Sequence, residues 1–300
     1  WKCSNTELTA LYTKDNMSTF NIAAEKNISV LLPTRGRGSV AFRSLQSMVE
    51  LADDASNIEF LVAIDNDDTD SAEYFTEHMI PWFEEHDLDL TVYQTQRWGY
   101  LQLHQYNNFL GARCRGKWIV FWNDDAVMQS QGWDTEILSY SGKFAIQAFD
   151  THDGHPYSIF PIIPRDWLIL FEKLSAHQQT DAWVSQIAWM ADCMIRLNSQ
   201  VLHDRADLTG NNYDDTFMQR EYREGNINDP LDINHINNMN LKQHWTAKVV
   251  WMRKLLGQDT GWWDRVMAGE VDPWEKMLEF DVNNHMQITK VAINPEAKTA

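Results

Sequence analysis

The chain has 300 residues, of which 44% are hydrophobic, so it can bury one large core or two unequal ones. Its formal charge of -18 argues against nucleic-acid backbones and anionic membrane surfaces as partners, because both attract basic faces. The three cysteines are odd in number and widely spaced, which predicts neither a disulfide framework nor a thiolate zinc site and favours a reducing cytoplasm. No apolar stretch reaches the roughly 20 residues of a membrane-spanning helix, so we expect no transmembrane segment.

The first 125 residues alternate short apolar runs with helical patterns, after a polar arm at 1–26. Strands are predicted at 28–32, 58–64, 88–93 and 118–122, and helices at 39–52, through 74–79 and at 102–114. Ser39 is a candidate cap for the first helix. Strands that alternate with helices of this length pair in parallel through right-handed crossovers. This half of the chain therefore predicts a nucleotide-binding half-sheet.

The second half of the chain is less regular. It predicts strands at 144–149, 158–163 and 200–203, and helices at 181–197 and 245–256. The stretch beyond Asp204, up to Asn240, is rich in Asn and Asp, which is typical of loops. We therefore expect a catalytic domain at 27–205 and a C-terminal extension at 206–300.

Polar clusters directly follow three of the four predicted parallel strands. They are Pro33-Thr34-Arg35, Asp65-Asn66-Asp67-Asp68 and Asn123-Asp124-Asp125. The carboxyl ends of parallel strands lie on one side of a sheet, so these clusters should converge on one crevice. The Asn-Asp-Asp strand end would suit a hard divalent cation that bridges protein oxygens and a diphosphate, whereas in isolation it would be an ordinary turn.

These motifs and their order resemble those of the GT-A glycosyltransferases, most closely the large inverting group called family 2. The resemblance lies in the strand and Pro-Thr loop of 28–37, the acidic strand end of 62–70, and the helix and DxD-like strand of 107–125. It covers about residues 27–205. It implies an α/β fold in which helices flank a mostly parallel, Rossmann-like sheet. It also implies transfer of a sugar from a nucleotide-diphosphate sugar to a hydroxyl group of a carbohydrate or other acceptor.

The same resemblance implies roles for individual residues. Those that would bind the nucleotide sugar are Pro33, Thr34, Arg35, Asp65, Asp67, Asn123 and Asp124. Asp125 and His203 would bind Mn²⁺ or Mg²⁺, and Asp181, at a helix start, would be the general base. Because Asn123 replaces the first acid of the DxD pattern, we expect weaker metal affinity than in a full DxD enzyme. The C-terminal extension would shape the acceptor site.

Two other functions stay open at this point. The run 36–41 satisfies G-x-G-x-x-A after a strand, and Asp65 ends the next strand, as in NAD(P)-dependent dehydrogenases. Against this, Pro33-Thr34-Arg35 separates the strand from the first glycine, and Asn123-Asp124-Asp125 would have no task. The second is a carbohydrate-binding relative without catalysis, since a fold does not guarantee an activity.

Simpler roles also remain for several of these side chains. Asp181 would be favoured at a helix N-terminus by the helix dipole alone, and a single His203 is commonly structural. Arg35 and Arg37 would be solvated loop charges. For Trp98 we expect a place in the pocket, because it precedes the helix that faces the crevice.

Overall fold

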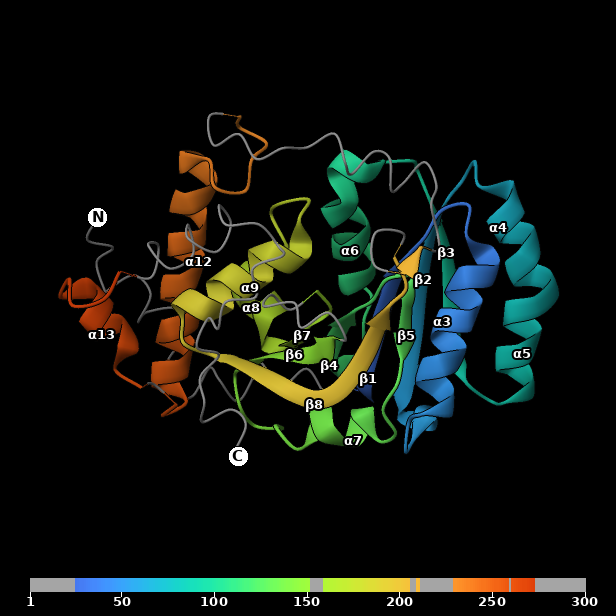
Figure 1. Cartoon of the computed structure of the whole chain (residues 1–300), viewed down its shortest axis with the longest axis horizontal. Helices are drawn as coiled ribbons and strands as arrows, with labels where there is room; N and C mark the ends of the chain where they lie inside the picture. The colour runs from blue at the N-terminus through green and yellow to red at the C-terminus, as the bar shows by residue number, and fades with distance from the viewer. Residues whose placement is uncertain (1–24, 152–158, 206–208, 211–228, 259, 273–300) are drawn as a thin grey trace.

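The computed structural model describes residues 25–151, 159–205, 209–210, 229–258 and 260–272. Within these ranges the chain forms one eight-stranded sheet with helices on both faces (Figure 1). The strands are β1 (Lys26–Pro33), β2 (Ile58–Asp65), β3 (Asp89–Thr95), β4 (Gly116–Phe121), β5 (Ala126–Met128), β6 (Ile146–Thr151), β7 (Pro161–Pro164) and β8 (Met194–His203). Their order across the sheet is β3-β2-β1-β4-β7-β6-β8-β5.

The helices flank this sheet in two groups. The α-helices are α3 (Gly38–Glu50), α4 (Thr69–Tyr74), α5 (Ile80–Glu85), α6 (Leu103–Gly111), α7 (Trp133–Leu138), α8 (Asp166–Phe171), α9 (Thr180–Met190), α12 (Ile236–Leu255) and α13 (Trp262–Met267). Short 3₁₀ turns, η1 (Ala55–Asn57) and η3 (Tyr100–Gln102), and a π-helical turn, η2 (Phe75–Met79), complete the list. Figure 1 shows α3, α4 and α5 on one side of the sheet and α6, α9 and α12 on the other.

Four strands form the parallel half of the sheet. β1 pairs in parallel with β2 and β4, and β2 pairs in parallel with β3. Side chains of a strand alternate between its faces, so Val30 packs in the core under α3 while Leu31 packs in the core under α6 and α9. Because both faces are covered, β1, β2 and β4 consist mostly of buried apolar residues, which is why the sequence predicts them well.

The other half of the sheet is mixed. β7 pairs antiparallel with β4 and β6, while β8 pairs in parallel with β6 and antiparallel with β5. In Figure 1, β8 is a long bent strand that crosses the molecule. At its carboxyl end the register sets His203 opposite Ala126, the residue after Asp125. The bend of β8 therefore brings a histidine from late in the chain to the Asn-Asp-Asp turn.

The helix α12 belongs to the same core as the sheet. Trp245 is buried and stacks on Phe171 of α8, with ring centroids 4.0 Å apart and an interplanar angle of 6°. The edge of Trp183 on α9 meets the same indole at 5.4 Å. A boundary between residues 205 and 206 stays a prediction, and any extension that begins there shares this aromatic core.

Several sequence predictions of secondary structure need correction. The helix predicted at 181–197 ends at Met190, because Asp192 adopts a positive φ of 50° and β8 begins at Met194. The last predicted helix begins at Ile236 rather than at residue 245. Ser39 is not a cap, since α3 already begins at Gly38. The arm at 1–26 lies almost wholly outside the described residues, as does much of the expected loop after Asp204.

Among the described residues, no helix combines the length and the apolar character needed to cross a membrane.

Candidate active site

The carboxyl ends of β1, β2, β3 and β4 meet at one edge of the sheet. The Thr34 N–H donates to the Ala63 carbonyl of β2 at 3.0 Å, and the Asn66 N–H donates to Thr95 of β3 at 2.7 Å. On the other side of β1, the Trp122 N–H donates to the Leu31 carbonyl at 2.9 Å. The three polar clusters therefore lie together, as parallel pairing requires.

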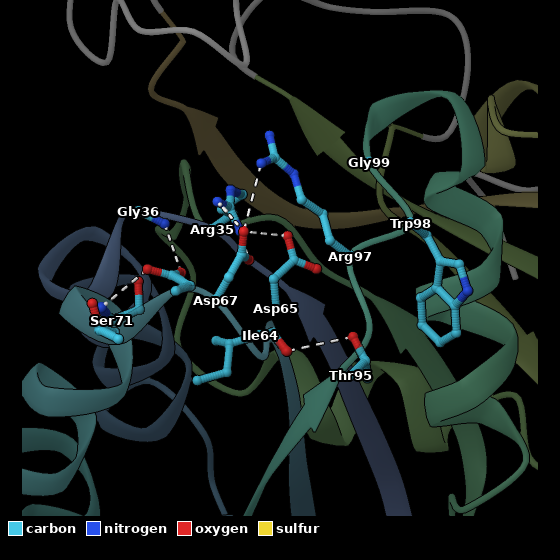
Figure 2. Close-up of polar contacts among 12 residues, drawn as sticks. Arg35, Gly36, Ile64, Asp65, Asp67, Ser71, Thr95, Arg97, Trp98 and Gly99 are labelled. Carbon is cyan, nitrogen blue, oxygen red and sulfur yellow. Dashed lines mark hydrogen bonds and ion pairs between the residues drawn. The ribbon is translucent and has the colours of Figure 1, made fainter.

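Asp65 ends β2 beneath a group of ion pairs. Its carboxylate is 2% exposed, and its Oδ2 accepts a hydrogen bond from Arg35 Nη1 at 2.8 Å. The same guanidinium donates to both carboxylate oxygens of Asp67, at 2.5 and 3.1 Å, and Arg97 lies 3.6 Å from Asp67. Figure 2 shows this group and the adjacent Gly36 N–H, which donates to Asp68 at 2.8 Å. Arg35 is thus held by two acids rather than being a solvated loop charge.

The hydroxyl of Tyr106 on α6 completes the surroundings of Asp65. It donates to Asp65 Oδ1 and accepts hydrogen bonds from the backbone N–H groups of Trp98 and Gly99, at 2.9 and 3.1 Å. One hydroxyl thereby ties the loop after β3 to the carboxylate that ends β2. The Trp98 side chain itself points away from the Asp65 cluster in Figure 2 and packs against Tyr106 and Phe109. The place of Trp98 in the pocket therefore stays a prediction, and its indole packs against an aromatic surface of α6.

In the Asn-Asp-Asp turn, both carboxylate oxygens of Asp124 accept hydrogen bonds from side chains of the protein. Thr34 Oγ1 donates to its Oδ2 at 2.6 Å, and Arg37 Nη1 donates to its Oδ1 at 2.9 Å. Asn123 is exposed, and its carbonyl accepts a hydrogen bond from Ser44 Oγ at 3.1 Å. The turn is therefore anchored to β1 and α3, with Asp124 pointing into the loop that follows β1.

Asp125 faces His203 across the β5–β8 pairing. Its Oδ1 is buried, accepts no hydrogen bond within the described residues, and lies 3.4 Å from His203 Nε2. Across those same ranges, no group of three or more His, Cys, Asp or Glu side chains is arranged to hold a metal ion. One carboxylate and one imidazole fit an ion that takes its remaining ligands from a diphosphate and water. They are too few to hold such an ion alone.

The two neighbouring carboxyl groups are shifted in opposite directions. Burial, and then the charge of Asp125, raise the pKa of Asp124, against the lowering effect of Arg37 and Thr34. Burial would also raise the pKa of Asp125, but its contact with His203 and the charge of Arg37 lower the pKa below its usual value. A proton shared by the pair is therefore favoured on Asp124, which leaves Asp125 ionised.

Asp181 lies in the first turn of α9 and is half-buried. The helix start is held beside α6 through Thr180, whose hydroxyl accepts from Asn107 Nδ2 at 3.5 Å. The preceding His177 donates from Nε2 to the Leu231 carbonyl at 2.9 Å and accepts at Nδ1 from the Gln179 N–H at 3.1 Å. Asp181 thus belongs to a different element from the Asp124–Asp125 pair, and its role as base stays a prediction.

Three residues of this site receive no functional role from the sequence. They are Arg37, Tyr106 and Asp204, and each is defined by a partner far away in the chain. Asp204 is buried after His203; its N–H donates to the Asp125 carbonyl at 2.7 Å, and its carboxylate accepts from Arg43 at 2.8 Å. A sequence signal exists only for Asp204, which directly follows the predicted His203.

Both glycines of the G-x-G-x-x-A pattern have local structural explanations. Gly36 has a positive φ of 66°, which L-residues with a side chain rarely adopt. A Cβ on Gly38 would lie 3.0 Å from Cβ of Tyr74, so this glycine permits α3 and α4 to approach closely. Neither glycine therefore requires a dinucleotide to account for it.

Solved structures with similar folds include a mannosyltransferase and TarS. The mannosyltransferase PcManGT from Pyrobaculum calidifontis, solved in complex with GDP-Man and Mn²⁺, matches with a TM-score of 0.53 at 12% identity, over 85% of this chain and 84% of its own. S. aureus TarS 1-349 in complex with UDP matches with a TM-score of 0.46 at 13% identity, over 59% of this chain and 60% of its own. Its complex with UDP-GlcNAc matches with a TM-score of 0.47 at 14% identity, over 64% of each chain.

This chain thus spans less than two thirds of the TarS fragment. A scan of protein-family models and a search of curated proteins give no match. PcManGT, in contrast, matches over most of both chains. With the mixed sheet and its flanking helices, that match shows that the chain has a GT-A-like glycosyltransferase fold.

Proposed function

We propose that the protein transfers a sugar from a nucleotide-diphosphate sugar to an acceptor hydroxyl, with inversion at the anomeric carbon, as in family 2. The observation that carries the proposal is the meeting of Asp65, Thr34 and the Asp124–Asp125 pair at one edge of the sheet, with His203 beside Asp125. In an open α/β sheet this edge is where ligands bind. The fold neighbour PcManGT was solved with GDP-Man and Mn²⁺, which agrees with a donor of this class.

Binding of the nucleotide falls to the ends of β1 and β2. Pro33 and Thr34 would border it, and Asp65, with Asp67, would accept hydrogen bonds from its base or ribose. Arg35 now occupies both acids, so it must share them or turn toward the ligand when the nucleotide enters. Its guanidinium is a third exposed and can move at modest cost. The ion pairs therefore keep these acids compensated in the absence of a ligand.

Asp125 and His203 would hold a Mn²⁺ or Mg²⁺ ion against the diphosphate. Such an ion supplies Lewis-acid stabilisation of the charge that grows on the leaving diphosphate. Asn123 and Asp124 would lie near the sugar or ribose. Because Asp124 is already bonded by Thr34 and Arg37, it would orient neighbours rather than bind the ion.

Asp181 would accept the proton of the acceptor hydroxyl as that oxygen attacks the anomeric carbon. The bond from this carbon to the diphosphate oxygen breaks, and the electron pair leaves with the diphosphate. A single base opposite the leaving group gives inversion. Asp181→Asn keeps size and removes basicity, so donor binding should persist while transfer falls roughly 10²- to 10⁴-fold. Near-normal transfer by this variant would eliminate Asp181 as the base.

A thermal-shift screen of nucleoside diphosphates tests the proposal. Binding to the native state raises the melting temperature by mass action, and we expect UDP or GDP to do so mainly with Mn²⁺ or Mg²⁺ present. Asp125→Ala should lose the metal-dependent part of the shift with an unchanged circular dichroism spectrum. Equal shifts with and without EDTA would refute the metal role, and a shift by NAD alone would favour a dehydrogenase.

A further inference from the structure

Arg37 lies between the two acids of the Asn-Asp-Asp turn. Its Nη1 is 2.9 Å from Asp124 Oδ1 and 3.9 Å from Asp125 Oδ2. The guanidinium side chain is only 10% exposed, and the two carboxylates are 11% and 12% exposed. A fixed positive charge is therefore buried against the two carboxylates, of which Asp125 is expected to bind a metal ion.

This charge has a physical reason to be there. Two adjacent buried carboxylates repel each other and lose hydration, so the folded protein must supply compensating charge. His203 is 3.4 Å from Oδ1 of Asp125, the oxygen opposite the one that Arg37 approaches. The charge of Arg205 also acts on Asp125, while Arg43 is engaged by Asp204. Arg37 contacts both acids of the pair.

We propose that Arg37 is a resident counter-cation that keeps a divalent ion from binding strongly until a donor diphosphate arrives. A diphosphate brings oxygen ligands for the ion and an alternative anionic partner for the guanidinium. Arg37 then turns from the carboxylates toward the phosphate oxygens, and the ion binds beside Asp125. Metal and diphosphate binding are thereby coupled. The diphosphate half of this inference rests on the proposed function, whereas the competition between Arg37 and metal does not.

The test is a titration of the nucleotide-free protein with Mn²⁺ alone, in which free Mn²⁺ is measured by electron paramagnetic resonance. The wild type should bind weakly, and Arg37→Met should bind at least about tenfold more tightly, a typical size for coupling between sites. Arg37→Lys keeps the charge and should stay near the wild type. Arg113→Met removes an equal charge from the segment before the amino end of β4, far from Asp125, and should also match the wild type.

A second variant guards against loss of folding. Arg37→Met/Asp124→Asn removes the ion pair as a unit, so it leaves no unpaired charge at Asp124 and still clears the place beside Asp125. It should also bind Mn²⁺ more tightly than Asp124→Asn alone. The inference would be overturned if Arg37→Met bound Mn²⁺ no more tightly than the wild type and Arg37→Met/Asp124→Asn bound it no more tightly than Asp124→Asn.

The coupling between nucleotide and metal binding is tested by repeating the Mn²⁺ titration with a nucleoside diphosphate present. UDP or GDP should raise the Mn²⁺ affinity of the wild type by about tenfold or more and that of Arg37→Met by less. Equal enhancement in the two proteins would overturn the coupling. Failure of both nucleotides to bind the wild type would count against the proposed function, while the titration with Mn²⁺ alone would still decide the role of Arg37.

Discussion

The hydroxyl of Tyr106 offers a sharp test of how the nucleotide edge is held together. Tyr106→Phe removes one oxygen that donates to the buried Asp65 and accepts from two backbone N–H groups, of Trp98 and Gly99. A hydrogen bond to a charged group contributes roughly 1.5–3 kcal/mol. The two N–H groups are half-buried and can recruit water, and Asp65 keeps Arg35. We therefore expect the free energy of unfolding to fall by about 2 kcal/mol.

The loop after β3 should also become less ordered near the nucleotide. We expect affinity for the bound nucleoside diphosphate to fall about tenfold, which corresponds to about 1.4 kcal/mol. Urea unfolding followed by circular dichroism and isothermal titration calorimetry measure the two effects. Tyr140→Phe is the matched control, because Tyr140 is also buried and its hydroxyl makes no hydrogen bond within the described residues. If Tyr106→Phe behaves like this control, the hydrogen bonds that link Asp65 to the loop through the Tyr106 hydroxyl do not contribute to stability or to nucleotide binding.

Two further predictions concern the core beneath the site. Burial lowers the pKa of His177 to about 4, so the folded protein binds fewer protons than the unfolded chain between about pH 4 and 6.5. Acidification across this window should lower the free energy of unfolding of the wild type by about 3 kcal/mol more than that of His177→Gln. Urea unfolding at several pH values measures this difference, and parallel pH profiles for the two proteins would contradict the prediction. Trp245→Ala should destabilise by about 3–5 kcal/mol by emptying the stack on Phe171, whereas the exposed Met267→Ala should stay within about 0.5 kcal/mol. Equal midpoints for these two variants would show that α12 is not part of the core.

The parallel half of the fold could be predicted because strands that are buried on both faces consist mostly of apolar residues. Residues 28–32 and 58–64 lie within observed strands, and the run 118–122 extends one residue beyond β4, which ends at Phe121. The helix α12 was predicted too short because its first turns, INNMNLKQH, are polar and offer no apolar stripe. The α9 helix was predicted too long because only the backbone at Asp192, with its positive φ, ends the pattern.

The site divides in the same way between local and distant information. Acids that directly follow strands could be predicted, since the strand end itself places them. The partners of those acids could not, because Arg37 and Asp124 are 87 residues apart and Tyr106 and Asp65 are 41 apart. Only the folded structure shows that Arg37, which looks like a solvated loop charge in the sequence, is buried against two carboxylates. The sequence alone therefore does not show which positive side chains compensate the buried carboxylates.

We propose that this edge of the sheet holds a nucleotide-diphosphate sugar and releases its diphosphate. The most direct measurement incubates the protein with a panel of UDP- and GDP-sugars, with Mn²⁺ or with EDTA, and detects free nucleoside diphosphate by chromatography and mass spectrometry. With water as the acceptor of the sugar, we predict metal-dependent release of nucleoside diphosphate from at least one donor by the wild type and none by Asp125→Ala. Release that is equal in the two proteins, or no binding of any donor by the folded wild type, would contradict the account.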